Sequence, residues 1–415
     1  MNNNILMYNI HHSTIFLKKI SFLEIFLMSI PKLLEVEVEI QDLFDDLKSD
    51  HIDRIVKFCS NLESEEHRHF FAYELSRFPG YRPHQLDTCI NLCLKLQENG
   101  FFGGMLKPLF LQYALLNTPV IISRLLDLSF YCFEEIDTEL NTYKQISSAI
   151  FFYKYYPSFS ERFRSFDQYY QWFAAERYYL EDLNDFLKYG WKKSSFGYAL
   201  KYDDVELIRV LSVDDNFDYN TSIYWSLFEW SLSPSSRIAI DIAAHFGSVK
   251  AFKYLLINGG TSEKLFISSI AGGSTEIIQM VNNTKINWEI SMVAVAQFHR
   301  KELVDWILAQ HPNTKMNPST MVRKEYLRTF LIALEKSTYV DQTDDDKKTS
   351  LHYSARNGSY NLVDYLIKKG SNIHAIDVLD LVFFLSSQYS WRYPSSFSFK
   401  KESSQYYRIV IKTRS

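Results

Sequence analysis

Apolar residues recur at spacings of three and four along most of the chain, which is the period of an α-helix with one buried face. In the first third this pattern predicts helices at residues 34–47, 51–62 and 86–96. Pro83 and the glycines of 100–104 interrupt the pattern and indicate connections between helices. Strand-like alternation of apolar and polar residues bounded by turns is almost absent. We therefore predict an all-α fold.

Residues 151–180 contain 14 aromatic side chains. Helix packing is the first interpretation of so many rings, and an aromatic face that binds a protein is the second. The interleaved basic residues would also suit stacking on single-stranded nucleic acid. Glu161, Asp167 and Glu176 lie in the same segment and argue against that third interpretation.

One stretch near the end of the chain has the pattern of a helical hairpin. The sequence Thr349-Ser350-Leu351-His352 opens it, the small Ala355 and the turn residue Gly358 follow, and Gly370 ends the second helix. Glycine permits the tight turn and the helix stop. A single hairpin cannot bury the apolar stripe formed by Leu362, Val363, Leu366 and Ile367, so the pattern predicts stacking on neighbouring hairpins.

Weaker copies of this hairpin precede it, at residues 238–260, 266–281 and 295–308. Their turn positions, Gly247, Gly273 and His299, are 26 residues apart, and Gly259 ends the first copy. A further step of 26 reaches Glu325, and a step of 33 from there reaches Gly358. Residues 198–211, and less clearly 113–126, fit the same pattern.

The best unit, residues 346–377, resembles an ankyrin repeat, with Ser350 in the place of the proline of the Thr-Pro-Leu-His opening. The run of divergent units before it is similar to ankyrin families expanded in parasitic protists, whose front half is a domain of unknown function. The resemblance implies a helix-turn-helix solenoid, shortened in several units, and a role in binding. It also implies structural roles for Thr349, His352, Ala355, Gly358 and Gly370, and for Gly247, Gly259 and Gly273.

The pattern divides the chain into four parts: a leader of doubtful status (1–30), a helical, aromatic-rich domain (31–190), divergent ankyrin repeats (191–376) and an irregular basic tail (377–415). Met28, followed by Ser-Ile-Pro, is a candidate for the true start, which would make residues 1–27 an artefact of the gene model. For the tail, a truncated or frame-shifted gene, an unusual cap and a basic binding segment stay open.

Composition narrows the classes of function. The net charge is −4 and the pI is about 6.3, so the chain as a whole offers no basic field for nucleic acid or anionic membrane. Four cysteines do not make a disulfide framework, and Cys89 and Cys93 are expected to share a buried helix face. Lys18, Lys19 and Glu24 break the apolar run near the start, so we expect no membrane span and a cytoplasmic protein.

Motifs for chemistry are missing. The cluster around Glu65–His69 lacks the spacing of a zinc helix, Gly100–Gly104 lacks the Lys-Ser/Thr pair of a phosphate loop, and Asp344–Asp346 lacks the alternation of a calcium loop. We therefore predict no catalytic residue, no metal and no cofactor. A catalytic reading has no motif behind it.

The predicted function is non-catalytic binding of an unidentified partner protein by a monomer, on the concave ankyrin surface. The candidate partner-binding residues are Asp345, Asp346, Lys348, Tyr353, Arg356 and Asn357 in the best unit, and His245, Phe246, Gln297 and Phe298 at the matching helix ends. One alternative is a substrate-receptor adaptor of a ubiquitin-ligase-type complex, with residues 31–150 docking the catalytic machinery. Another is a truncated remnant without function.

Overall fold

The computed structural model describes residues 31–377 except 33, 144–147, 149, 156–181, 215–216, 233, 235 and 282–285. The predicted leader, most of the aromatic segment and the basic tail lie outside the described residues. Helices account for most of what is described, and no β-strand occurs within those ranges. Ser222 and Ile238 form an isolated antiparallel bridge. The prediction of an all-α fold is confirmed.

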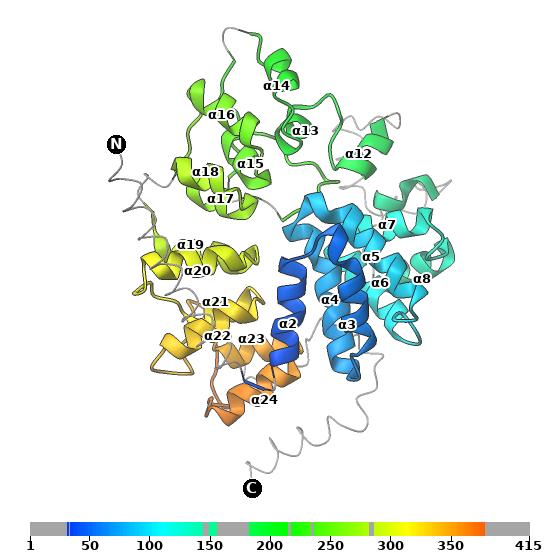
Figure 1. Cartoon of the computed structure of the whole chain (residues 1–415), viewed down its shortest axis with the longest axis vertical. Helices are drawn as coiled ribbons and strands as arrows, with labels where there is room; N and C mark the ends of the chain where they lie inside the picture. The colour runs from blue at the N-terminus through cyan, green and yellow to red at the C-terminus, as the bar shows by residue number, and fades with distance from the viewer. Residues whose placement is uncertain are drawn as a thin grey trace, which may run out of the picture. The chain divides into compact units, whose positions relative to one another are not determined.

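The first part of the chain is a series of helices with short connections (Figure 1). They are α2 (Glu35–Asp45), α3 (Ile52–Ser60), α4 (Glu65–Tyr81), α5 (Leu86–Glu98), α6 (Leu106–Asn117), α7 (Pro119–Asp127) and α8 (Phe133–Tyr143), with 3-10 turns η1 (Ser49–His51), η2 (Pro83–Gln85) and η3 (Ile150–Tyr155). Helix α4 packs on α2 and α6, and α6 packs on α8, while α5 packs on α3 and α7. Successive helices therefore alternate between two layers, as in a stack of hairpins.

The second part continues with shorter helices. They are α12 (Leu183–Tyr189), α13 (Phe196–Lys201), α14 (Val205–Leu211), α15 (Ala239–Phe246), α16 (Val249–Ile257), α17 (Leu265–Gly272), α18 (Thr275–Val281), α19 (Trp288–Gln297), α20 (Lys301–Gln310), α21 (Pro318–Arg323), α22 (Leu327–Lys336), α23 (Ser350–Arg356) and α24 (Tyr360–Lys368).

From α13 onward the helices form hairpins. The first helices stack in the order α13, α15, α17 and α19, and the second helices in the order α14, α16 and α18. Farther along, α23 packs on α21 and on its own partner α24. Hairpins that stack in this way within a unit bury their apolar stripes on one another.

The turn inside each hairpin has a left-handed backbone. The φ angle is +71° at Gly247, +68° at Gly273 and +65° at Gly358, and it is +48° at His299 and +60° at Glu325. The five positions singled out by the 26- and 33-residue spacing therefore share one conformation, although two of them carry side chains that rarely adopt it. The earlier candidate unit at 113–126 differs, because Thr118 joins α6 to α7 with φ −146°.

The described residues form two compact units. The first comprises the described residues up to Met316 together with Lys324–Thr329, and the second comprises Asn317–Arg323 and residues 330–377. The predicted boundary near residue 190 falls inside the first unit, and the division at that point stays a prediction.

Candidate functional site

The loop that precedes α23 is a tight finger held by one aspartate. The Asp344 carboxylate oxygen Oδ1 accepts hydrogen bonds from the backbone N–H groups of Asp346 (3.1 Å) and Lys348 (3.0 Å). The Asp344 N–H donates to the carbonyl of Lys348 (3.1 Å), and Lys347 closes the turn at φ +56°. Asp345, Asp346 and Lys347 are exposed at the tip.

Tyr353 anchors the finger to the helix behind it. Its hydroxyl donates to Asp344 Oδ2 at 2.6 Å, and its side chain is buried, with 3% exposed. Burial raises the pKa of Tyr353 and the hydrogen bond to Asp344 raises it further, so the phenol stays a donor. Arg323 Nη1 lies 3.9 Å from the same Asp344 oxygen, and Asn317 Nδ2 donates to the Thr343 carbonyl at 2.7 Å. Tyr353, predicted to face a partner, instead positions the finger.

A capping box begins helix α23. The His352 N–H donates to Thr349 Oγ1 (3.4 Å), and the Thr349 N–H donates to His352 Nδ1 (3.2 Å). Both side chains are buried, as is Ala355. The reciprocal bonds satisfy two backbone donors of the first turn. The capping box therefore stabilises the first turn of α23, in line with the structural role that the resemblance implies for this pair.

The other candidates of this unit are accessible. Asp345, Asp346 and Arg356 are exposed, and Lys348 and Asn357 are partly exposed. Lys348 Nζ lies 3.8 Å from an Asp346 carboxylate oxygen and 3.5 Å from one of the buried Asp377. The finger and the end of α23 thus combine acidic and basic side chains within one repeat.

The four candidates in the first unit lie in a different environment. His245, Phe246 and Phe298 are buried, and Gln297 is partly exposed and accepts a hydrogen bond from Lys324 Nζ (2.9 Å). Burial lowers the pKa of His245 to about 3, with the nearby Arg300 charge adding to the effect, so the ring is neutral.

The chain itself covers these helix ends. The Trp225 ring stacks on Phe246 at a centroid distance of 6.0 Å and meets His245 edge-on, also at 6.0 Å. His84 Nε2 lies 3.2 Å from the Phe246 carbonyl oxygen. Because buried side chains cannot reach a partner without a rearrangement, His245, Phe246 and Phe298 do not offer an exposed binding face within the first unit.

Several residues of this geometry were missed by the sequence analysis. Asp344 carries a local signal, because an aspartate that starts a turn accepts from the backbone two residues on. Arg323 lies in a different helix from the finger and has no sequence signal.

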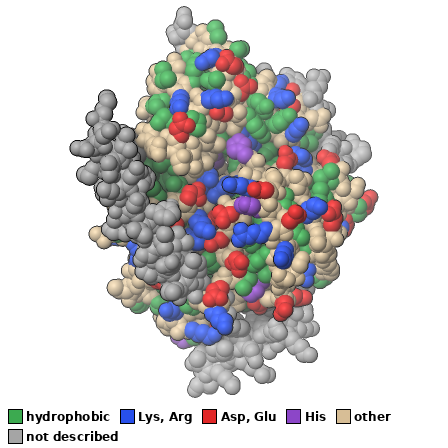
Figure 2. Space-filling view, viewed as in Figure 1, with side chains coloured by type: hydrophobic (Ala, Val, Ile, Leu, Met, Phe, Trp, Pro, Cys, Tyr) green, Lys and Arg blue, Asp and Glu red, His purple; other side chains and the backbone are tan. Residues whose placement is uncertain are grey.

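Positive and negative side chains are intermixed on the face shown in Figure 2. Among the described residues, no helix is both long enough and apolar enough to cross a membrane. Over the same ranges, no group of three or more His, Cys, Asp or Glu is placed to hold a metal ion.

Stacked two-helix hairpins with left-handed turns, a finger and a capped first helix define a helical-hairpin repeat protein. The family model described as ankyrin repeats (3 copies) matches residues 291–377. Ankyrin repeat domain-containing protein 49 of Bos taurus is 34% identical over 79 residues, which is 18% of this chain and 33% of the relative. The human protein of the same name is 33% identical over 79 residues, with the same shares covered. This chain spans about a third of the length of these curated relatives.

Among solved structures, the human ASB11 ankyrin repeat domain is similar to 45% of this chain over 89% of its own length, with 15% identity and a TM-score of 0.32. That likeness supports no conclusion about function. The family match shows ankyrin repeats in residues 291–377, and the predicted ankyrin units are confirmed over that range. Repeats of this class characteristically serve as surfaces for binding other proteins. The resemblance to protist families with a particular N-terminal domain stays a prediction.

Proposed function

We propose that this chain is a non-catalytic scaffold that binds a partner protein through the finger Asp344–Lys348 and the adjoining end of helix α23. The observation that supports this proposal most is the exposure of Asp345, Asp346 and Arg356 on a rigid support. The Asp344 turn and the Tyr353 hydroxyl fix the finger, so a partner would meet a preorganised surface. The cytoplasmic location and the monomeric state stay predictions.

The partner-facing charges can be separated from the support. We expect charge reversal by Asp345→Lys, Asp346→Lys and Arg356→Glu to leave the repeat folded, because all three side chains are exposed. The same triple change should weaken binding at least about tenfold, equivalent to about 1.4 kcal/mol, since complementary charges become repulsive. The matched control is Asp364→Lys with Lys368→Glu, which reverses an ion pair on the second helix α24.

The experiment captures partners of the full chain from a native lysate by quantitative mass spectrometry and then measures the dissociation constant of each purified candidate. A partner bound by the wild type and the control, and lost by the triple variant, would support the proposal. Equal binding by all three proteins would place the site elsewhere. Failure of the wild type to bind any protein directly would contradict a scaffold role.

A further inference from the structure

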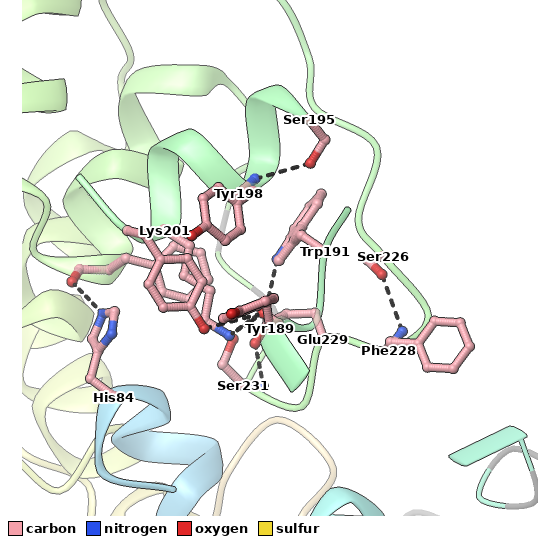
Figure 3. A network of polar contacts seen from close by, with 12 residues as sticks. His84, Tyr189, Trp191, Ser195, Tyr198, Lys201, Ser226, Phe228, Glu229 and Ser231 are labelled. Carbon is pink, nitrogen blue, oxygen red and sulfur yellow. Dashed lines mark hydrogen bonds and ion pairs between the residues drawn. The ribbon is translucent and has the colours of Figure 1, made fainter. Parts of the chain in front are cut away.

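The connection between α14 and α15 is longer than the one between the next two hairpins. It runs from residue 212 to 238, whereas Asn258–Lys264 joins the next two hairpins. Its described part contains no regular helix or strand, and its Glu229 lies beside Trp191 and Lys201 (Figure 3). Side chains of this connection are held there by specific hydrogen bonds and ring contacts.

The centre of these contacts is the Glu229 carboxylate, which accepts three short hydrogen bonds. Glu229 Oε2 accepts from Trp191 Nε1 at 2.6 Å and from Lys201 Nζ at 2.9 Å, and Oε1 accepts from the Ser231 N–H at 3.0 Å. The side chains of Lys201 and Glu229 are fully buried. Lys201 Nζ also donates to the Tyr189 carbonyl at 3.0 Å, and this second hydrogen bond helps to orient the ammonium group.

Two glycines make room for this arrangement. A Cβ atom on Gly190, where φ is +80°, would lie 2.6 Å from Glu229 Oε2. A Cβ atom on Gly197 would lie 2.1 Å from the Trp191 ring. A side chain at Gly190 would collide with the carboxylate, and one at Gly197 would displace the indole that binds it. The stretch Gly190–Lys201 is therefore shaped around a carboxylate.

Aromatic rings flank the carboxylate on the bound segment. The Trp230 ring centroid lies 3.7 Å from Lys201 Nζ, a cation–π contact in a dry environment. Phe228 stacks on Phe186 at 5.3 Å and meets Phe151 edge-on at 5.6 Å. The bound motif is thus an acidic residue between two aromatic ones.

The fit of this segment is incomplete. The Trp230 indole N–H and the Ser231 hydroxyl are buried with no hydrogen-bond partner among the described residues. A buried ion pair contributes little net stability, because the loss of hydration offsets the attraction between the charges. Binding hot spots in protein interfaces are enriched in Trp, Tyr and Arg and lie in desolvated pockets, and Trp191 and Trp230 fit that composition.

We propose that Gly190, Trp191, Gly197 and Lys201 form a second binding site, for an acidic–aromatic peptide segment of a partner protein, and that the chain's own Phe228–Ser231 occupies it as an internal pseudo-ligand. This site is separate from the finger of the second unit, and the inference does not depend on that proposed function. A partner segment must compete with the tethered one. Its apparent affinity is therefore the intrinsic affinity multiplied by the fraction of molecules in which the site is open.

The test uses the full chain and a fluorescein-labelled synthetic peptide of residues 224–232. The receptor is kept intact while the internal segment is weakened by Glu229→Gln with Trp230→Ala. We expect this variant to bind the peptide at least tenfold more tightly than the wild type does, as measured by fluorescence anisotropy. Adding Lys201→Met to the same variant, or replacing the peptide's glutamate by glutamine, should reduce that binding at least tenfold. Equal peptide binding by the wild type and the folded variant would overturn the proposal.

A second measurement covers the case in which the variant does not fold. Saturating peptide added to the wild type should displace the internal segment and speed amide hydrogen exchange in residues 226–232 at least threefold. Exchange in helices α13 and α15 should not change. No acceleration in residues 226–232, or an equal acceleration throughout the unit, would also overturn the proposal.

Discussion

At the scale of single residues, the described structure has charged groups in its interior, and each depends on a specific partner. Lys201 and Glu229 are the clearest case, because neither side chain is accessible to solvent. Burial lowers the pKa of Lys201, while the adjacent Glu229 charge raises it. Removing one partner of such a pair leaves an uncompensated charge, whereas removing both can leave stability unchanged.

We predict that Glu229→Ala lowers the free energy of unfolding by about 3–5 kcal/mol. The double change Lys201→Met with Glu229→Leu should destabilise less than the single one, because it removes both charges, although the Trp191 and Ser231 N–H donors lose their acceptor in both variants. Urea unfolding followed by tryptophan fluorescence measures both. As a control, Glu206→Ala breaks an exposed pair with Arg209 and should change stability by less than about 0.5 kcal/mol. A double variant as unstable as the single one would contradict this account.

Asp45 gives a prediction about pH. Its Oδ2 accepts a hydrogen bond from the Tyr326 hydroxyl at 2.6 Å, and Arg82 lies 3.9 Å away. Burial outweighs these contacts and raises the pKa of Asp45 from 3.8 to about 7. The folded state therefore keeps a proton that the unfolded state releases between pH 4 and 7, so this group makes the protein less stable as pH rises through that window.

Asp45→Asn removes the titration and keeps an oxygen acceptor for Tyr326. The unfolding free energy of the variant minus that of the wild type should increase by at least about 2 kcal/mol from pH 5 to pH 8. Denaturant unfolding at both pH values measures this difference. The contribution of the buried histidines to the pH dependence cancels, because both proteins contain them. A stability difference that does not depend on pH would show that Asp45 titrates normally.

At the scale of the helical hairpin, the left-handed turn is the shared element, and tertiary contacts decide which residue can occupy it. His299 lies between the rings of Tyr81 (4.3 Å) and Tyr326 (4.5 Å) and stacks on both. Glu325 pairs with Arg77 and accepts from the Tyr73 hydroxyl at 2.9 Å. These contacts offset the strain of about 1–2 kcal/mol that a non-glycine residue has in this conformation.

Gly272 lies where two neighbouring hairpins approach each other closely. A Cβ atom there would lie 2.1 Å from the Ala244 carbonyl oxygen and 2.7 Å from the Gly247 nitrogen, both backbone atoms of the preceding hairpin. Gly272→Ala should therefore destabilise the first unit by about 1–3 kcal/mol or more, since neither atom can rotate away. Gly103→Ala is the control, because its Cβ would meet only the Gly100 carbonyl oxygen, at 3.5 Å. Thermal unfolding that is equally affected by both changes would contradict the packing argument.

At the scale of the first unit, several side chains from residues 31–155 contact the repeats, and Arg82 and Gln41 are among those that bind backbone groups at the turns. Arg82 donates to the carbonyl oxygens of Phe298 (2.7 Å) and His299 (2.8 Å), at the end of helix α19. Gln41 donates to the Glu325 carbonyl (2.8 Å) and accepts from the Leu327 N–H (2.9 Å). These bonds satisfy backbone groups that the turns leave unpaired.

We predict that Arg82→Met with Gln41→Leu uncouples the two parts of this unit. The Arg82 hydrogen bonds involve a charged group and contribute about 1.5–3 kcal/mol each, and those of the neutral Gln41 contribute about 0.5–1.5 kcal/mol each, so their loss weakens the coupling between neighbouring hairpins. Hydrogen exchange in α2 and α4 should then become faster while α15 and α17 keep their protection. Arg124→Met, which breaks an ion pair with the exposed Asp87, is the control and should leave both regions unchanged. Uniform exchange across all four helices in the double variant would indicate a single cooperative block.

The sequence by itself determined what depends on neighbours along the chain. Helix periodicity, the glycine turns at Gly247, Gly273 and Gly358, and the Thr349–His352 spacing that forms a capping box all follow from contacts within a few residues. Only the tertiary structure decided which surfaces are covered. The Trp225 ring covers His245 and Phe246, and Glu229 accepts a hydrogen bond from Lys201. Asp45 accepts a hydrogen bond from Tyr326, which lies 281 residues farther along the chain. Such contacts depend on how whole hairpins stack, and local pattern does not encode the neighbour that a given face will meet.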